Sequence, residues 1–91
     1  MTALPWPADR HLDLRGLACP LPVLKARKAL IGLAPGQRLS LAATDPLAAV
    51  DIPHFCKEAG HVLVNEKAGD GTFWFLIARG PAPAGSAPEP A

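Results

Sequence analysis

Two prolines set one residue apart, Pro20 and Pro22, restrict the fold of this chain more than any other feature. Proline has no backbone N–H and a fixed φ, so a helix tolerates it best in the first turn, where the N–H groups have no intrahelical partner. Apolar residues then recur at helical spacing. The pair therefore predicts a helix over residues 20–33. Cys19 is its expected N-cap, Pro20 its first residue and Pro22 its third.

Period-two alternation and turn residues predict four strands in addition to this helix. They are expected at residues 11–15, 38–43, 61–67 and 72–79, with a Gly-Asp-Gly hairpin turn at residues 69–71. The last strand is apolar on both faces, so we expect it to be an inner strand of the sheet.

A second helix is expected to be interrupted, because Pro53 deep inside a helix would remove a hydrogen bond. We predict a loose turn over residues 47–50, a new cap at Asp51 and a helix over residues 52–59. The element order is then β-α-β-α-β-β. The expected fold class is α/β, a two-layer sandwich in which two helices cover one face of a four-stranded mixed sheet.

Proline content marks the ends of the folded part. Residues 1–10 are expected to form a flexible leader, residues 11–80 the folded domain, and residues 81–91 a disordered Pro/Ala-rich tail. The tail has no large apolar side chain, so it cannot bury enough surface to offset the entropy of ordering it.

Composition narrows the class of function. Nine basic and eight acidic side chains give a net charge of +1, which provides no global basic field for direct nucleic-acid binding. No apolar run approaches the ~20 residues of a membrane helix, and no signal peptide is recognisable, so we expect no membrane contact and a cytoplasmic location. Two cysteines without an export signal indicate a compartment that keeps thiols free. The three histidines form no ligand motif, so neither a metal nor another cofactor is expected.

Cys19 follows a strand and the break at Gly16, and it precedes the amphipathic helix. A helix N-terminus carries roughly +0.5 of an elementary charge, which would favour the thiolate and lower the cysteine pKa from about 8.5. Because Pro22 has no N–H, the expected hydrogen-bond donor to the sulfur is the amide of Leu21. No histidine is placed by the sequence to pair with Cys19. We interpret it as a nucleophile held ready for a partner.

The motif Cys-Pro-Leu-Pro at residues 19–22 resembles the signature of the TusA (SirA-like) sulfur carriers. Residues 12–17, which precede the motif, belong to the same signature, and residues 44–46 and 51–56 resemble two further family segments in the same order. The resemblance, from about residue 12 to residue 80, implies a two-layer sandwich and a sulfurtransferase-type relay that depends on partner proteins for turnover. It implies that Cys19 takes sulfane sulfur as a persulfide from a cysteine desulfurase or a rhodanese-like donor and passes it to a protein acceptor. Known destinations in the family are tRNA thiolation, molybdenum-cofactor synthesis and sulfur oxidation.

The residues expected to support the sulfur site are Gly16, Pro20, Leu21 and Pro22. Some family members have an acidic residue at position 21 and a basic one at position 50, where this chain has Leu21 and Val50. Both departures bear on partner choice and leave the persulfide chemistry untouched.

Candidate partner-docking residues are Lys25, Arg27, Lys28 and Asp45. The three basic side chains are equally well explained as a solvated helix face, and Asp45 is most simply a helix cap. As docking residues, the basic ones would attract an acidic sulfur donor or acceptor.

Two functions of other classes stay open. One is a thiol redox protein that cycles a disulfide between Cys19 and Cys56, although the pair lacks C-x-x-C spacing. Cys56 is more simply a buried, inert thiol on a core-facing helix. The other is a non-catalytic interaction or regulatory module. A selenium carrier is a close variant of the sulfur carrier.

Overall fold

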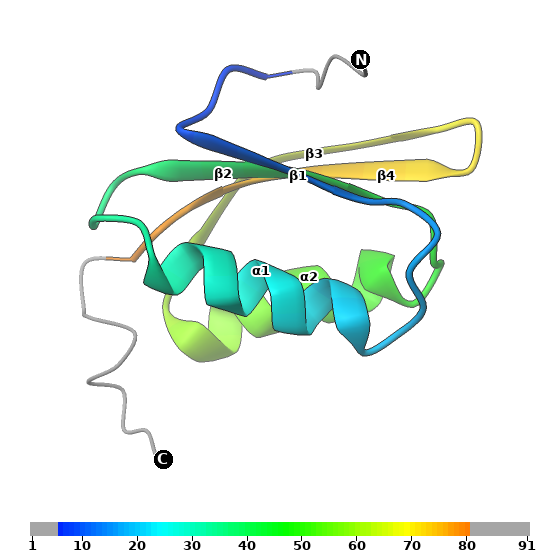
Figure 1. Ribbon diagram of the computed structural model, residues 1–91, viewed down its shortest axis with the longest axis horizontal. Helices are drawn as coiled ribbons and strands as arrows, with labels where there is room; N and C mark the ends of the chain where they lie inside the picture. Colours follow the sequence, from blue (N-terminus) through cyan, green and yellow to red (C-terminus); the bar gives the residue numbers. More distant parts are fainter. Residues whose placement is uncertain (1–5, 81–91) are drawn as a thin grey trace.

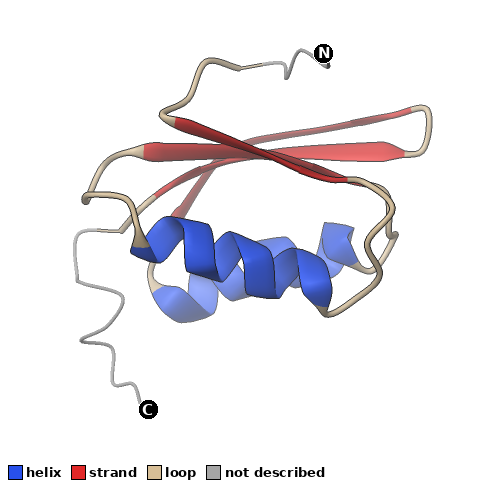
Figure 2. Ribbon diagram, in the orientation of Figure 1, coloured by secondary structure: helices blue, strands red, loops and turns tan. Residues whose placement is uncertain are grey.

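Two parallel strands joined by a crossover helix begin the fold, in a computed structural model that describes residues 6–80 (Figure 1). The six elements are β1 (Arg10–Leu14), α1 (Leu21–Ile31), β2 (Arg38–Ala43), α2 (Ala48–Ala59), β3 (Val62–Gly69) and β4 (Thr72–Ala78). Both helices lie on the same face of the sheet, so the predicted fold class and element order are confirmed (Figure 2). The predicted tail, residues 81–91, and the first half of the predicted leader lie outside the described residues.

The strand order in the sheet is β1-β2-β4-β3. Strand β2 runs parallel to β1 and antiparallel to β4, which also pairs with β3, so the sheet is mixed. The expectation that residues 72–79 form an inner strand is confirmed. On β4, Phe75 and Ile77 face the core, while Leu76 is buried on the opposite face.

The core lies between the sheet and the two helices. Leu41 of β2 pairs with Phe75 of β4, and both pack with Leu30 of α1 and Ile52 of α2. Leu30, Leu41 and Ile52 are completely buried. Full burial of each such side chain contributes about 1.5–3 kcal/mol, so these contacts fix both helices against the sheet.

The hairpin that joins β3 to β4 turns at Asp70 and Gly71, whose φ angles are 52° and 78°. Positive φ at both central residues is the type I′ geometry, which Asp-Gly favours and which matches the twist of the flanking strands. The predicted turn is confirmed, and β3 extends to Gly69.

Helix α1 begins one residue later than expected, and its N-cap is Pro20 instead of Cys19. A turn precedes it, in which the Leu21 amide donates to the Ala18 carbonyl at 2.9 Å. Pro22 is then the second helical residue. Proline at the cap and proline in the first turn are both sterically tolerated, so the motif alone does not separate the two registers.

Helix α2 is continuous through Pro53, so the predicted loose turn over residues 47–50 and the new cap at Asp51 are wrong. Ala48 and Ile52, one turn apart, are both buried in the core. An interior proline costs about 3 kcal/mol, and the full burial of Ile52 contributes about 1.5–3 kcal/mol. The two effects are of the same order, and packing keeps the first turn helical.

Helix α2 ends at Gly60, whose φ of 80° lies in the left-handed region, and the His61 amide donates to the Cys56 carbonyl. This C-terminal cap explains why β3 starts at Val62, one residue later than expected. No helix in residues 6–80 is long and apolar enough to cross a membrane.

The stability of the fold should decrease at mildly acidic pH because of His61. Its ring is buried, and its Nδ1 accepts a hydrogen bond from the Gly80 amide at 3.0 Å, which requires the neutral form. Burial, with the charge of Arg79, lowers the pKa of His61 below its ordinary value. The unfolded chain therefore binds this proton more tightly, and the stabilisation is complete above about pH 6.5 and lost as the pH falls further.

His61→Asn tests this prediction, because the amide oxygen can accept the Gly80 N–H without titrating. Urea unfolding at pH values on either side of about 6.5 should give a steeper loss of unfolding free energy in the wild type than in the variant. Equal slopes for the two proteins would contradict the prediction.

Candidate functional site at Cys19

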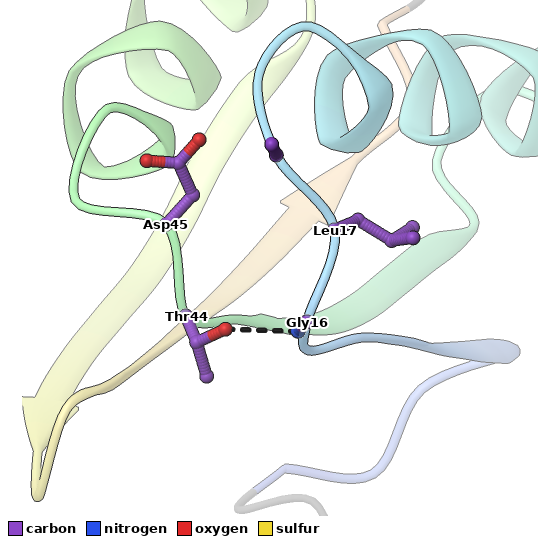
Figure 3. Close-up of a pocket in the computed structure, with 5 residues that line it drawn as sticks. Gly16, Leu17, Thr44 and Asp45 are labelled. Carbon is purple, nitrogen blue, oxygen red and sulfur yellow. Dashed lines mark hydrogen bonds between the residues drawn. The ribbon is translucent and has the colours of Figure 1, made fainter.

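Two loops meet at the carboxyl ends of β1 and β2, where the helices α1 and α2 also begin (Figure 1). The strands are parallel neighbours, so both chains leave the sheet at the same edge. The Gly16 amide donates to Thr44 Oγ1 at 2.9 Å and ties the loops together (Figure 3). Gly16 has a φ of 85°, a conformation that disfavours other residues. An open cavity of about 280 Å³ lies between the loops, lined by Gly16, Leu17, Ala18, Thr44 and Asp45.

Asp45 connects the start of the second helix to the cysteine loop. Its Oδ1 accepts from the Leu47 amide at 3.0 Å, and its Oδ2 accepts from the Cys19 amide at 2.6 Å. Leu47 is itself the N-cap of α2, so Asp45 forms a turn just before the helix. The side chain predicted for docking or capping thus positions the backbone of Cys19.

The Cys19 thiol is exposed and donates a hydrogen bond to Asp51 Oδ2 at 3.1 Å. This bond raises the pKa of the Cys19 thiol, and loss of hydration and the charges of Asp51 and Asp45 act in the same direction. A carboxylate that accepts the thiol proton stabilises the neutral form. The contacts of Cys19 with the described residues therefore favour the protonated thiol over the thiolate.

Two expectations about Cys19 are wrong for one reason. The Leu21 amide donates to the Ala18 carbonyl and not to the sulfur, and the thiol pKa is raised instead of lowered. Because α1 starts at Leu21, the sulfur lies outside the first turn. The attraction of a helix terminus falls off within that turn, whereas Asp51 acts in direct hydrogen-bond contact.

The other residues of the motif follow Cys19 into the start of α1. Pro20 and Leu21 are exposed, whereas Pro22, in the first turn of α1, is buried. Six predicted site residues therefore lie in the two loops and the first turn of α1: Gly16, Cys19, Pro20, Leu21, Pro22 and Asp45.

The three basic residues lie further along α1, and all are exposed. The Arg27 guanidinium carbon lies 5.5 Å from the centroid of the Phe55 ring, so this side chain packs across the helix pair. The side chains of Lys25 and Lys28 form no hydrogen bond or ion pair with other residues in the range 6–80.

Sequence reasoning missed the role of Asp51, which it interpreted only as a helix cap. The signal that could have found it is topological: parallel β-α units start their helices at the same end, so the first turn of α2 faces the loop before α1. Leu21 and Val50, whose identities were expected to bear on partner choice, are exposed, and so are two apolar side chains that the sequence analysis did not consider, Leu24 and Leu47. Their exposed fractions are 43% for Leu21, 49% for Leu24, 56% for Leu47 and 67% for Val50.

Cys56 is 2% exposed, and burial raises the pKa of its thiol to about 11. It belongs to the core cluster with Phe55 and Ile52, as predicted for a buried thiol. No group of three or more His, Cys, Asp or Glu side chains in residues 6–80 is arranged to hold a metal ion.

Cys56→Ala should lower the free energy of unfolding by about 1 kcal/mol, because it removes one buried sulfur from the core. A thiol reagent applied to the native wild type should titrate Cys19 quickly and Cys56 only on unfolding, whereas the variant should show a single thiol in both states. Rapid titration of both thiols in the native protein would contradict the placement of Cys56 in the core.

Comparison with known families gives a consistent match. The model of the family described as Sulfurtransferase TusA matches residues 10–79. The sulfur carrier protein TusA of Allochromatium vinosum is 45% identical over 69 residues, which cover 76% of this chain and 91% of that protein. The TusA of Pseudomonas paraeruginosa is 44% identical over 71 residues, covering 78% of this chain and 90% of the relative.

A solved structure shares the fold. The SirA-like protein from Desulfitobacterium hafniense superposes with a TM-score of 0.70 and 23% sequence identity, covering 78% of this chain and 97% of that one. At this identity the likeness supports the architecture, which agrees with the sandwich described above.

Proposed function

The chain belongs to the TusA family of sulfur carriers, and from this premise we propose that Cys19 is the residue that carries the sulfur, as a persulfide. The observation that supports this role is the contrast between the two cysteines. Cys19 is exposed in a loop that other elements hold in place, whereas Cys56 is buried in the core. An incoming protein can reach only the first of these sulfurs without unfolding the domain.

The carried group is a sulfane sulfur that moves between cysteines. The Cys19 sulfur attacks the terminal sulfur of a donor persulfide, and the donor leaves as a thiol. In the next encounter, an acceptor takes the terminal sulfur and Cys19 returns to the thiol. Each step exchanges one sulfur–sulfur bond for another, so the relay needs neither a resident cofactor nor an external oxidant.

The proposed donor is a cysteine desulfurase or a rhodanese-like protein, and the proposed acceptor is a protein of tRNA thiolation, molybdenum-cofactor synthesis or sulfur oxidation. The relay involves proteins and not nucleic acid or membrane directly. The two free thiols support a cytoplasmic location, where reducing conditions keep cysteines unpaired.

The proposed docking surface has an apolar and a basic part. Leu21 lies two residues from Cys19, and Val50 precedes Asp51, so a protein that brings a sulfur to Cys19 would also cover these exposed side chains. Lys25 and Lys28 add positive charge on the exposed side of α1. Charge of this kind speeds the encounter with an acidic partner more than it strengthens the final complex.

Sulfur uptake at Cys19 can be measured by intact mass. After incubation with a cysteine desulfurase and cysteine, or with a rhodanese and thiosulfate, the wild type and Cys56→Ala should each gain one sulfur atom, and Cys19→Ser should gain none. An adduct that persists in Cys19→Ser would show that the sulfur is carried elsewhere.

The basic part of the docking surface is tested by Lys25→Glu combined with Lys28→Glu, which leaves the Arg27 stacking on Phe55 intact. Sulfur transfer from an acidic protein donor should become slower and less sensitive to salt, while loading from a small persulfide should change little. The matched control is Lys57→Glu with Lys67→Glu, which makes the same change in net charge on α2 and β3. Equal effects from the two pairs would mean that α1 has no specific docking role.

A further inference from the structure

One charged side chain touches the sulfur of Cys19, and no step of the relay described so far uses it. Asp51, in the first turn of α2, accepts the thiol hydrogen bond at 3.1 Å. The other charged group at the cysteine is Asp45, in the loop before α2, which faces the backbone amide instead. Both Asp45 oxygens already accept backbone N–H groups, so Asp51 is the carboxylate directed at the reacting atom.

The proton on Cys19 has to leave during sulfur transfer, because the thiolate is the attacking species. A group that takes a proton in the transition state must lie within hydrogen-bond reach of it. Among residues 6–80, the thiol donates to Asp51, and Asp51 forms no ion pair that would compete for its charge. The geometry needed for this step is therefore already in place before a partner arrives.

We propose that Asp51 is a catalytic residue of sulfur transfer that takes the Cys19 proton during the attack and returns it to the leaving thiolate. This inference rests on the proposed role of Cys19 as the persulfide carrier. It gives Asp51 a function beyond holding the thiol in one orientation.

The step balances in atoms and electrons. As the Cys19 proton moves to the Asp51 carboxylate, the sulfur lone pair attacks the terminal sulfur of the donor R–S–SH and forms the new sulfur–sulfur bond. The old sulfur–sulfur bond breaks, its electron pair leaves on the donor sulfur, and the proton on Asp51 neutralises that thiolate. The products are the Cys19 persulfide and R–SH, with no net oxidation. Delivery to an acceptor runs through the same proton positions in reverse.

Asp51→Asn separates this role from a purely electrostatic one, because the two predict opposite signs. The substitution removes the negative charge beside the sulfur, so the Cys19 pKa should fall and alkylation by iodoacetamide at neutral pH should become faster. Loading from glutathione persulfide should nevertheless become about tenfold slower, since a positioned proton acceptor contributes about a hundredfold and the larger thiolate fraction offsets part of its loss. A small donor is used so that protein docking does not affect the rate.

The experiment is done in the Cys56→Ala background, so that Cys19 is the sole thiol. Glu58→Gln is the matched control: it makes the same chemical change on the exposed part of the same helix, where Glu58 lies 4.0 Å from His54, and it should leave both rates unchanged. Asp51→Glu, which restores a carboxylate, should recover part of the loading rate.

Loading by Asp51→Asn that is unchanged, or that accelerates together with alkylation, would overturn the catalytic role and leave Cys19 as the carrier. Failure of the unsubstituted protein to take up sulfur would overturn the carrier role itself, and this inference with it.

A measurement without substitution gives a second test. The rates of loading and of alkylation of the wild type are each divided by the corresponding rate of a small model thiol at the same pH. As the pH falls below the Cys19 pKa, the loading ratio should decline less steeply than the alkylation ratio. Parallel declines of the two ratios would contradict the proposal.

Discussion

The carboxylate of Asp45 holds the candidate site together. One of its oxygens accepts the Leu47 amide at the start of α2, and the other accepts the Cys19 amide before α1. These bonds can form because β1 and β2 are parallel neighbours, so the loops that follow them lie at the same edge of the sheet. With the bond from Gly16 to Thr44, they place the first turn of α2 against the cysteine loop and bring Asp51 to the sulfur. The site therefore depends on the pairing of two strands.

The chemistry at Cys19 reflects a competition between a helix terminus and a carboxylate. The N-terminus of α1 favours a thiolate, but the sulfur lies outside the first turn, and Asp51 accepts the thiol proton directly. The pKa of Cys19 is accordingly raised. A thiol that stays protonated until a donor is bound reacts less with oxidants and alkylating agents, because these attack the thiolate. Low reactivity toward small reagents is useful for a carrier whose cysteine has to react with particular partner proteins.

Most of the fold could be predicted from local patterns. The wrong predictions, the interruption of α2 and the environment of Cys19, mostly concern contacts between segments that are distant in the sequence. The strand at residues 38–43 and the Asp-Gly turn follow from alternation and backbone preference, which are local properties. The continuity of α2 through Pro53 depends on core packing, which the local rule for proline does not include. The motif and position of Cys19 predict a reactive cysteine, but its hydrogen-bond partner is 32 residues away. No local signal relates Asp51 to it; only the parallel arrangement of the two β-α units does.

In the free carrier, the hydrogen bond to Asp51 favours the protonated form of Cys19. The ultraviolet absorbance of the thiolate, followed against pH in Cys56→Ala protein, measures the pKa of Cys19 directly. We expect a midpoint above the value of about 8.5 for an ordinary cysteine. A midpoint below that value would contradict the raised pKa, because the attraction of the helix terminus would then outweigh the bond to Asp51.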